Sequence, residues 1–469
     1  MCSSSVSAQD IVWANKNNID KRTNFTKVIG QNKHGVYVLK HKNSTFKKYF
    51  IVEQFDKRMN LLRSKTFKIN NAQLEKIVVQ NDGLIVFTKV YEKNNSKKLM
   101  MNTIDSNLIE KNGVLLVGEQ AMGNNSSIRI YYNKTKSKLL VNVFAEKGNN
   151  TSLNYYLIES NLLTHSGQTN LNFKYSDLYI GEGIIDEQGN LHQLLSQSDK
   201  FKSKNAADFF HFLYSLNTKT NVANERLIND RNTFISNYQL IDNEVSNEVI
   251  AIGFYGNRYE DENKGYFYVK IDGKTHQVKE NQFIEIDRAI VSQIIGLKNE
   301  QKGESINKFT IKKLIPKIDG GLIVISERAF VTTQSDIFYV NGVPQSSYAR
   351  IFNNDEVLIF SLNTQGQTEW HHIINKNQSS INDGGYYNGI IVMVNDADFN
   401  ILYNDRLSVN ADIIQVTFNE KGETTKKVLL NNEQYFALLI PSEYKQVNAN
   451  SVVIPINQNR DYTYIKLIY

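Results

Sequence analysis

Apolar and polar residues alternate with a period of two along most of this chain, and short turns rich in Asp, Asn and Gly interrupt the alternation. A period of two places successive side chains on opposite faces of an extended strand. Three segments show a strand, a turn and a second strand with particular clarity. They are GYFYVKIDGKTHQVK (265–279), VLIFSLNTQGQTEWHHI (357–373) and IIQVTFNEKGETTKKVLL (413–430). The pattern therefore predicts a succession of antiparallel hairpins.

The hairpins recur in units of similar size. The apolar runs that precede their turns fall near Tyr49, Leu99, Leu139, Leu178, Tyr266, Val357 and Ile413. The first intervals are about 40–50 residues long, which is the spacing of four-stranded propeller blades. We therefore predict an all-β fold, a single β-propeller of about seven degenerate four-stranded blades, with six or eight blades as alternatives. The apolar C-terminal run YTYIKLIY (462–469) is expected to pair with an early strand and close the ring.

Two segments depart from the strand pattern. NAADFFHFLYSL (205–216) is compatible with a short amphipathic helix, and FIEIDRAIVSQIIGL (283–297) fits a helix and a strand equally well. KNEQKGESIN (298–307) has the composition of an exposed loop.

Charge and cysteine content narrow the functional classes. The 54 basic and 48 acidic residues are interleaved, and the net charge is only +6. Nucleic-acid binding needs Lys and Arg gathered on one face, so no nucleic-acid partner is expected. No apolar run approaches the ~20 residues of a membrane-spanning helix. The single cysteine, Cys2, excludes an internal disulfide and a metal site built from several cysteines.

Cys2 is followed by the small, polar stretch SSSVSAQD. This is the sequence that remains when a bacterial lipoprotein signal is removed and a start Met is added. On this interpretation Cys2 carries diacylglycerol, residues 1–12 form a flexible tether, and residues 13–469 form the propeller. Two or three acyl chains anchor a protein firmly, whereas one chain alone is marginal. The alternative is an incidental, exposed cysteine.

Residues 312–405 contain a set of recognisable motifs. KKLIPKIDGGLIVISE (312–327) is followed by DEVLIFSLNTQGQTEWHHIINKNQSSINDGGYYNGIIVMV (355–394) and NILYND (400–405). The arrangement resembles the uncharacterised β-propeller lipoproteins of Bacteroidota, which combine DGG before a strand, a hxLNxxGxxxW motif and an NDGGYY loop. This resemblance implies a propeller fold and an outer-membrane location, and it brings no activity. Surface-export signals in such lipoproteins place acidic residues after the cysteine, whereas serines follow Cys2 here, so the periplasmic and surface sides both stay open.

The NDGGYY loop is the best-defined local motif. Asp383, Gly384, Gly385, Tyr386 and Tyr387 match the loop of the family. The aspartate can accept hydrogen bonds from its own turn, and the two glycines permit positive φ. The tyrosines suit contact with a partner or a sugar, which makes this a candidate partner- or ligand-binding loop. The interpretation that the turn chemistry favours is a structural turn whose tyrosines pack between blades.

Trp370 matches the tryptophan of the family motif, and it is expected to pack between adjacent blades. The neighbouring His371 and His372 point to opposite faces of a strand, so no metal site is expected there. Asp396, Asp398 and Asn400 lack the following Gly and Glu of a calcium-binding EF-hand loop. We therefore predict no metal, no cofactor and no identifiable catalytic residue. A carboxylate pair at the propeller axis would be invisible in the sequence.

These observations favour a non-catalytic cell-envelope lipoprotein, an accessory or scaffold subunit that binds an outer-membrane protein or complex. This inference rests on the general use of propellers as rigid binding scaffolds. One alternative is a glycan- or peptidoglycan-binding lipoprotein. The other is a glycosidase or lyase with a carboxylate pair at the axis.

Overall fold

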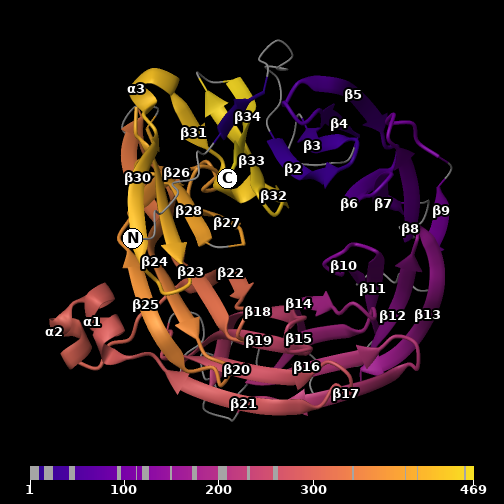
Figure 1. Cartoon of the computed structure of the whole chain (residues 1–469), viewed down its shortest axis with the longest axis horizontal. Coiled ribbons are helices and arrows are strands. Elements are labelled where there is room, and N and C mark those ends of the chain that lie inside the picture. Colours follow the sequence, from indigo (N-terminus) through magenta and orange to yellow (C-terminus); the bar gives the residue numbers. More distant parts are fainter. Residues whose placement is uncertain are drawn as a thin grey trace, which may run out of the picture.

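Eight antiparallel sheets follow one another around a ring (Figure 1), so the chain is an all-β propeller, with the larger of the blade numbers that the sequence allowed. The computed structural model describes residues 10–14, 25–41, 48–91, 97–111, 113–118, 126–147, 150–171, 177–198, 209–229, 233–256, 262–340, 343–396, 398–408, 410–458 and 461–469. Cys2 and the residues before Asp10 lie outside this part of the chain. Among the described residues, no helix combines the length and the apolar character needed to cross a membrane.

The first four blades each contain four strands that pair in chain order. Blade 1 holds β2 (Phe25–Asn32), β3 (Gly35–His41), β4 (Tyr49–Phe55) and β5 (Leu61–Lys68). Blade 2 holds β6 (Ala72–Gln80), β7 (Gly83–Tyr91), β8 (Lys97–Asp105) and β9 (Val114–Val117). Blade 3 holds β10 (Ser126–Tyr132), β11 (Lys138–Lys147), β12 (Asn150–Glu159) and β13 (Leu162–Leu171). Blade 4 holds β14 (Asp177–Ile185), β15 (Leu191–Ser198), β16 (Phe209–Asn217) and β17 (Val222–Leu227).

The next three blades keep this order and carry insertions. Blade 5 holds β18 (Phe234–Asn243), β19 (Glu248–Gly256), β20 (Gly265–Asp272) and β21 (Val278–Glu285), and the helices α1 (Arg288–Ile295) and α2 (Leu297–Gln301) follow it. Blade 6 holds β22 (Phe309–Pro316), β23 (Leu322–Val340), β24 (Val343–Leu362), β25 (Thr368–Ile374) and the short β26 (Gln378–Ile381). Blade 7 holds β27 (Ile391–Val394), β28 (Asp398–Asn404), β29 (Ile413–Asn419) and β30 (Thr424–Leu430).

Blade 8 is assembled from both ends of the chain. It holds β31 (Ala437–Leu439), β32 (Lys445–Asn448), β33 (Ser451–Gln458) and β34 (Asp461–Ile468), with α3 (Asn432–Tyr435) before them and a 3₁₀ turn, η5 (Pro441–Glu443), between β31 and β32. The N-terminal strand β1 (Asp10–Trp13) pairs with β34, from Asp10 opposite Ile468 to Trp13 opposite Ile465. The expected pairing of the C-terminal strand with an early strand is therefore confirmed. Asp10, Ile11 and Val12, which the sequence analysis assigned to the tether, belong to this sheet, and residues 1–9 lie outside the described part of the chain.

Each junction between neighbouring blades contains its own apolar core. The described residues form eight large clusters, and each combines strands of two adjacent blades, including blades 8 and 1. A blade is thus covered on both faces, and its middle strands are buried throughout, as in β3 and β19. Outer strands such as β5, β17 and β30 are mostly exposed. Because each sheet buries its faces only against its neighbours, the ring has to close for every blade to be covered.

The Asp and Asn residues of the predicted turns shape the hairpins. In several turns, the side-chain oxygen of the first residue accepts the backbone N–H group four residues later, which stabilises the reversal locally. In these turns the N–H group of Asn60 donates to Asp56, that of Ile109 to Asp105, that of Asn190 to Asp186, that of Gln367 to Asn363 and that of Glu423 to Asn419.

The ring has eight blades, whereas the sequence analysis preferred seven. The missed unit is blade 8, which does not follow the repeating pattern. Its inner strand is split into β31 and β32, and its outermost strand comes from the N-terminus. The segment 205–216 is not helical where the structure describes it, since Phe209–Asn217 forms β16 and pairs with β15. The segment 283–297 ends strand β21 and then forms α1, and the expected loop after it begins with α2.

Candidate functional site

The first strand of each of blades 1 to 7 lies nearest the centre of the ring, and in blade 8 this place is taken by β32 (Figure 1). Five of these inner strands are interrupted by an irregular register, which bends a strand and redirects its side chains. The shifts fall between Val28 and Gly30, Leu74 and Lys76, Ile180 and Gly183, Ile235 and Asn237, and Ile311 and Lys313. Because bulges of this kind are common beside functional sites, the inner wall is the first place to look for one.

Four lysines from four blades gather near the inner strands. Lys76 lies on β6, Lys136 in the turn after β10, Lys313 on β22 and Lys445 at the start of β32. All four interact electrostatically with Tyr132, the last residue of β10. The Lys76 ammonium lies 4.8 Å from the centre of the Tyr132 ring. We call these five residues the lysine cluster.

The electrostatics of the lysine cluster show that its cations crowd one another. Burial lowers the pKa of Lys136 and of Lys313, and the Lys445 ammonium lowers both further. Burial acts to raise the pKa of Tyr132, yet Lys445, Lys76 and Lys136 outweigh it and hold that pKa below its usual value. Lys313 is nevertheless exposed and the other cluster lysines are half-buried. Water therefore reaches a group of positive charges that favours an anion.

Two cavities adjoin this part of the inner wall. One, of about 540 Å³, is lined by Lys76, Arg129, Tyr131 and Glu182, among others. The other, of about 530 Å³, extends between blades 4 and 5, and both include Tyr179, Gly181 and Glu182 in their lining. Tyr179 is 59% exposed, so it offers an accessible aromatic side chain. The Tyr131 and Tyr238 hydroxyls take part in hydrogen bonds with Gln193 and with the Leu194 carbonyl, respectively.

A serine and a histidine meet in the second cavity, but their hydrogen bonds argue against nucleophilic catalysis. Ser196 Oγ lies 2.7 Å from His211 Nδ1, and His211 Nε2 accepts the Ile235 N–H group at 3.2 Å. The proton of the neutral ring is therefore on Nδ1, where it is donated to Ser196, so the ring cannot accept a proton from that hydroxyl. Burial lowers the pKa of His211 to about 3. The pair is a satisfied polar contact of the wall.

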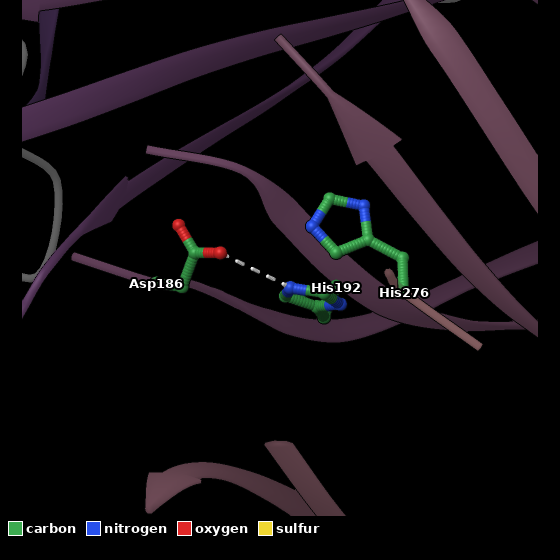
Figure 2. A group of neighbouring side chains, drawn as sticks. All are labelled: Asp186, His192 and His276. Atoms are coloured by element: carbon green, nitrogen blue, oxygen red, sulfur yellow. Dashed lines mark ion pairs between the residues drawn. The ribbon is translucent and has the colours of Figure 1, made fainter. Parts of the chain in front are cut away.

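A second polar cluster lies at the junction of blades 4 and 5. Asp186 follows β14, His192 is on β15, and His276 lies in the turn between β20 and β21. All three are buried, and their ligand atoms lie within 4.8 Å of one another (Figure 2). This is the group among the described residues whose donor atoms converge as metal ligands do.

Charges around this cluster are unevenly distributed. Burial opposes ionisation of Asp186, but the nearby His192 ring and the hydrogen bonds from Asn190 hold the pKa of its carboxyl below the usual value. Asp242, on β18, is half-buried beside the cluster. Burial, and then the Asp186 and Glu244 carboxylates, raise the pKa of Asp242 to about 6. The cluster therefore lies in a region of negative potential.

The structure draws the two tyrosines of the NDGGYY loop into the fold. Tyr386 and Tyr387 are half-buried. The Tyr386 hydroxyl donates to the Thr26 carbonyl of blade 1 at 3.4 Å, and the Tyr387 hydroxyl accepts from Asn457 of blade 8 at 2.7 Å. Asp383 accepts the Gly385 N–H group at 2.8 Å, as its turn requires. The loop thus links the end of blade 6 to the ring closure, while Gly384 and Gly385 line a separate cavity of about 400 Å³.

Trp370 lies on β25 and contacts the next blade. Its indole Nε1 donates to the Glu420 carbonyl at 3.3 Å, and its ring lies against Gly422 in the turn between β29 and β30. The neighbouring His372 packs edge-on against Phe418 of that next blade, blade 7, with ring centres 5.2 Å apart. Cys2 lies outside the described residues.

Sequence reasoning missed both the lysine cluster and the Asp186, His192 and His276 cluster. Two of the lysines, Lys76 and Lys313, stand among apolar residues of inner strands, in AQLEKIVVQ (72–80) and FTIKKLIP (309–316). A cation inside an otherwise apolar run was the available signal. Nothing in the sequence connects His276 with His192, because they belong to different blades.

Comparisons with known proteins add little beyond these observations. No protein-family model and no curated protein matches this chain. The polysaccharide lyase Uly1 aligns over 84% of this chain and 89% of its own, at 8% identity and a TM-score of 0.41. The WD40 domain of SCAP from fission yeast aligns over 99% and 98%, at 9% identity and a TM-score of 0.39. Prolyl oligopeptidase B from Galerina marginata aligns over 93% of this chain and 56% of its own, at 9% identity and a TM-score of 0.43. Similarity at this level carries no argument about activity.

Proposed function

We propose that this protein is a non-catalytic binding propeller of the cell envelope whose inner wall binds an acidic glycan. The observation that carries the proposal is the lysine cluster, in which lysines of four blades interact electrostatically with Tyr132, Lys76 lies 4.8 Å from its ring centre, and all remain accessible to water. A chain bearing carboxylate or sulfate groups would relieve the repulsion among these ammonium groups.

The adjoining cavities supply what a sugar ring needs. Tyr179 offers an exposed aromatic side chain against which a pyranose can stack. Glu182, in both cavities, and Glu75 offer acceptors for sugar hydroxyls, although Glu75 is also paired with Lys89 at 2.6 Å. The Ser196 and His211 pair does not supply a serine nucleophile to these cavities, because the His211 ring lacks the required proton acceptor at Nδ1.

The test measures binding of polygalacturonate and dextran sulfate, with neutral dextran as the reference polymer. We expect the two polyanions to bind and the affinity to fall with added salt, since accessible charges are screened. Lys313→Gln combined with Lys445→Gln should weaken binding about 10-fold or more, the range for charge-assisted hydrogen bonds. The matched control is Lys426→Gln with Lys427→Gln, on the exposed outer strand β30, which should leave binding unchanged. The proposal would be contradicted if neutral dextran bound as tightly as the two polyanions. It would also be contradicted if the Lys313 and Lys445 double variant bound the polyanions as tightly as the wild type does.

A second candidate function, an accessory subunit for an outer-membrane protein or complex, is favoured by the hairpin of blade 6. β23 and β24 have 19 and 20 residues, whereas β19 has 9. Beyond the pairing of β24 with β26, their far part forms a two-stranded ribbon in which residues 333–337 are all exposed. Ile337 and Tyr348 on this ribbon are 71% and 69% exposed. Because an isolated hairpin is only marginally stable in water, a partner that covers it would stabilise it.

This second function is tested by pull-down from detergent-solubilised envelope membranes, followed by mass spectrometry. Ile337→Asp with Tyr348→Asp should lose the partner, whereas the Lys313 and Lys445 double variant should keep it. Recovery of the wild-type chain without any companion would remove the accessory-subunit proposal. Attachment through Cys2 is tested separately, by metabolic labelling with a fatty acid, where Cys2→Ala should abolish the label.

A further inference from the structure

We propose that Asp186, His192 and His276 form a binding site for a divalent transition metal ion, with Zn²⁺ as the best match, at the junction of blades 4 and 5. The site is independent of the glycan proposal, because it lies in the interior between two blades. Two imidazoles and one carboxylate are a donor set that binds zinc and similar ions. Figure 2 shows the three side chains converging on one point from three separate segments.

The geometry between Asp186 and His192 fits two ligands of one ion better than it fits a direct contact. Asp186 Oδ2 and His192 Nε2 are 3.6 Å apart, which is too far for a hydrogen bond. Two ligand atoms with bonds of about 2.1 Å to a tetrahedral zinc ion are about 3.4 Å apart. The ligand atoms of all three residues lie within 4.8 Å of one another, so a modest rotation of one ring completes the site.

His192 is oriented as a metal ligand. The ring is completely buried, and its Nδ1 lies 3.0 Å from Ser215 Oγ. The opposite nitrogen, Nε2, has no hydrogen-bond partner within the described part of the chain. A buried polar atom normally has one, and a metal-binding histidine normally donates its other N–H group to a neighbour. Both features have a single explanation if Nδ1 donates to Ser215 and Nε2 presents its lone pair to a cation.

Asp186 is held in place by its own turn. Its carboxylate accepts the Asn190 backbone N–H group at 2.8 Å and the Asn190 side-chain amide at 2.9 Å. Asp56 and Asn60 form the same turn in blade 1, with distances of 2.8 and 3.0 Å, on the surface. The turn therefore requires only the Asp and Asn pair. The two histidines at Asp186 are an addition that turn formation does not explain.

His276 brings the neighbouring blade into the site. Its backbone has φ of +57°, a conformation that costs free energy in a non-glycine residue and that asparagine tolerates best. Its ring meets His192 edge-on, with centres 5.1 Å apart. A bound ion would therefore connect β15 of blade 4 to the turn between β20 and β21 of blade 5. The Asp242 carboxylate interacts with both Asp186 and His192 and adds to the attraction of the group for a cation.

The experiment uses the full chain, stripped with a chelator and dialysed. Zn²⁺ is titrated in while bound metal is measured by elemental mass spectrometry and the Tm by calorimetry. We expect one ion per chain and a higher Tm with zinc. Co²⁺ should give the intense visible absorption of a tetrahedral site. His276→Asn, which keeps the backbone conformation, should bind at least 10-fold more weakly and lose the zinc-dependent rise in Tm.

Two controls separate this site from general metal affinity. Asp56→Asn removes the carboxylate of the matching turn without histidines, and His371→Asn removes an imidazole from blade 6; both should bind zinc as the wild type does. The proposal is overturned if the wild type takes up no zinc, if Co²⁺ remains octahedral, or if His276→Asn binds like the wild type. Should His276→Asn fail to fold, the Co²⁺ spectrum of the wild type decides between the outcomes.

Discussion

The buried ion pair of blade 6 gives the sharpest test of how this fold is stabilised. Glu327 on β23 is fully buried, and its carboxylate lies 2.8 Å from the Lys376 ammonium and 3.1 Å from that of Lys312. Asn354 donates to the same carboxylate at 2.8 Å. Lys376, which is also buried, donates to the Asn354 carbonyl at 2.8 Å and to Gln378 at 3.0 Å.

We predict that Lys376→Met lowers the free energy of unfolding by about 3 kcal/mol at pH 7. Breaking a buried ion pair by removing one partner costs about 3–5 kcal/mol, because the other charge stays buried without compensation. The lower end applies here because Lys312 and Asn354 still contact Glu327. Replacing both members, as in Glu327→Leu with Lys376→Met, should cost less than the single change, since no charge is then left buried.

The pH dependence of the free energy of unfolding provides a second, independent test of this ion pair. Burial acts to raise the pKa of Glu327, but Lys376 and Lys312 outweigh it and lower that pKa below its usual value. A carboxyl with a lowered folded-state pKa stabilises the protein above the unfolded value of about 4.3, and this stabilisation is lost as the pH falls through the folded value. The stability difference between wild type and Lys376→Met should therefore shrink below about pH 4.

Urea denaturation followed by circular dichroism at pH 7 and at lower pH measures both effects. Lys33→Met is the matched control, because Lys33 and Asp82 form an ion pair on the surface, with side chains 64% and 76% exposed. An exposed pair contributes about 0–1 kcal/mol, so this change should be close to neutral. A loss below about 1 kcal/mol for Lys376→Met, or a loss that does not depend on pH, would refute the reasoning.

Three further predictions follow from the described contacts. Gly422→Ala should destabilise the protein by about 2 kcal/mol more than Gly303→Ala, as measured by urea denaturation. Both glycines have similar positive φ values, so the cost of the backbone conformation is shared. Only a Cβ at position 422 would meet another side chain, because it would lie 2.6 Å from the Trp370 ring. Lys445→Gln should raise the pKa of Tyr132, because Lys445 is the largest influence that lowers it; absorbance titration, with Tyr132→Phe to isolate the signal, measures the shift. Deleting the residues up to Ala14 should make the chain more sensitive to limited proteolysis, because the deletion removes β1 from blade 8; equal cleavage rates would contradict this role.

The sequence by itself determined the strands, the hairpins and the propeller class. Strand periodicity and turn chemistry are local, so the turns that begin at Asn363 and Asn419 can be recognised without knowledge of their neighbours in space. The same local signals located seven of the eight blades. They did not count blade 8 as a separate unit, although they did predict that its last strand, β34, pairs with an early strand, which is β1.

Only the tertiary structure decided which side chains meet. Lys76, Lys313 and Lys445 belong to three different strands, and they become one cluster because the inner strands of different blades face a common centre. His192 and His276 approach each other only across a blade junction. Burial in a strand is set by the period along the chain, whereas contact between blades is set by the curvature of the ring, and a linear sequence does not display that curvature.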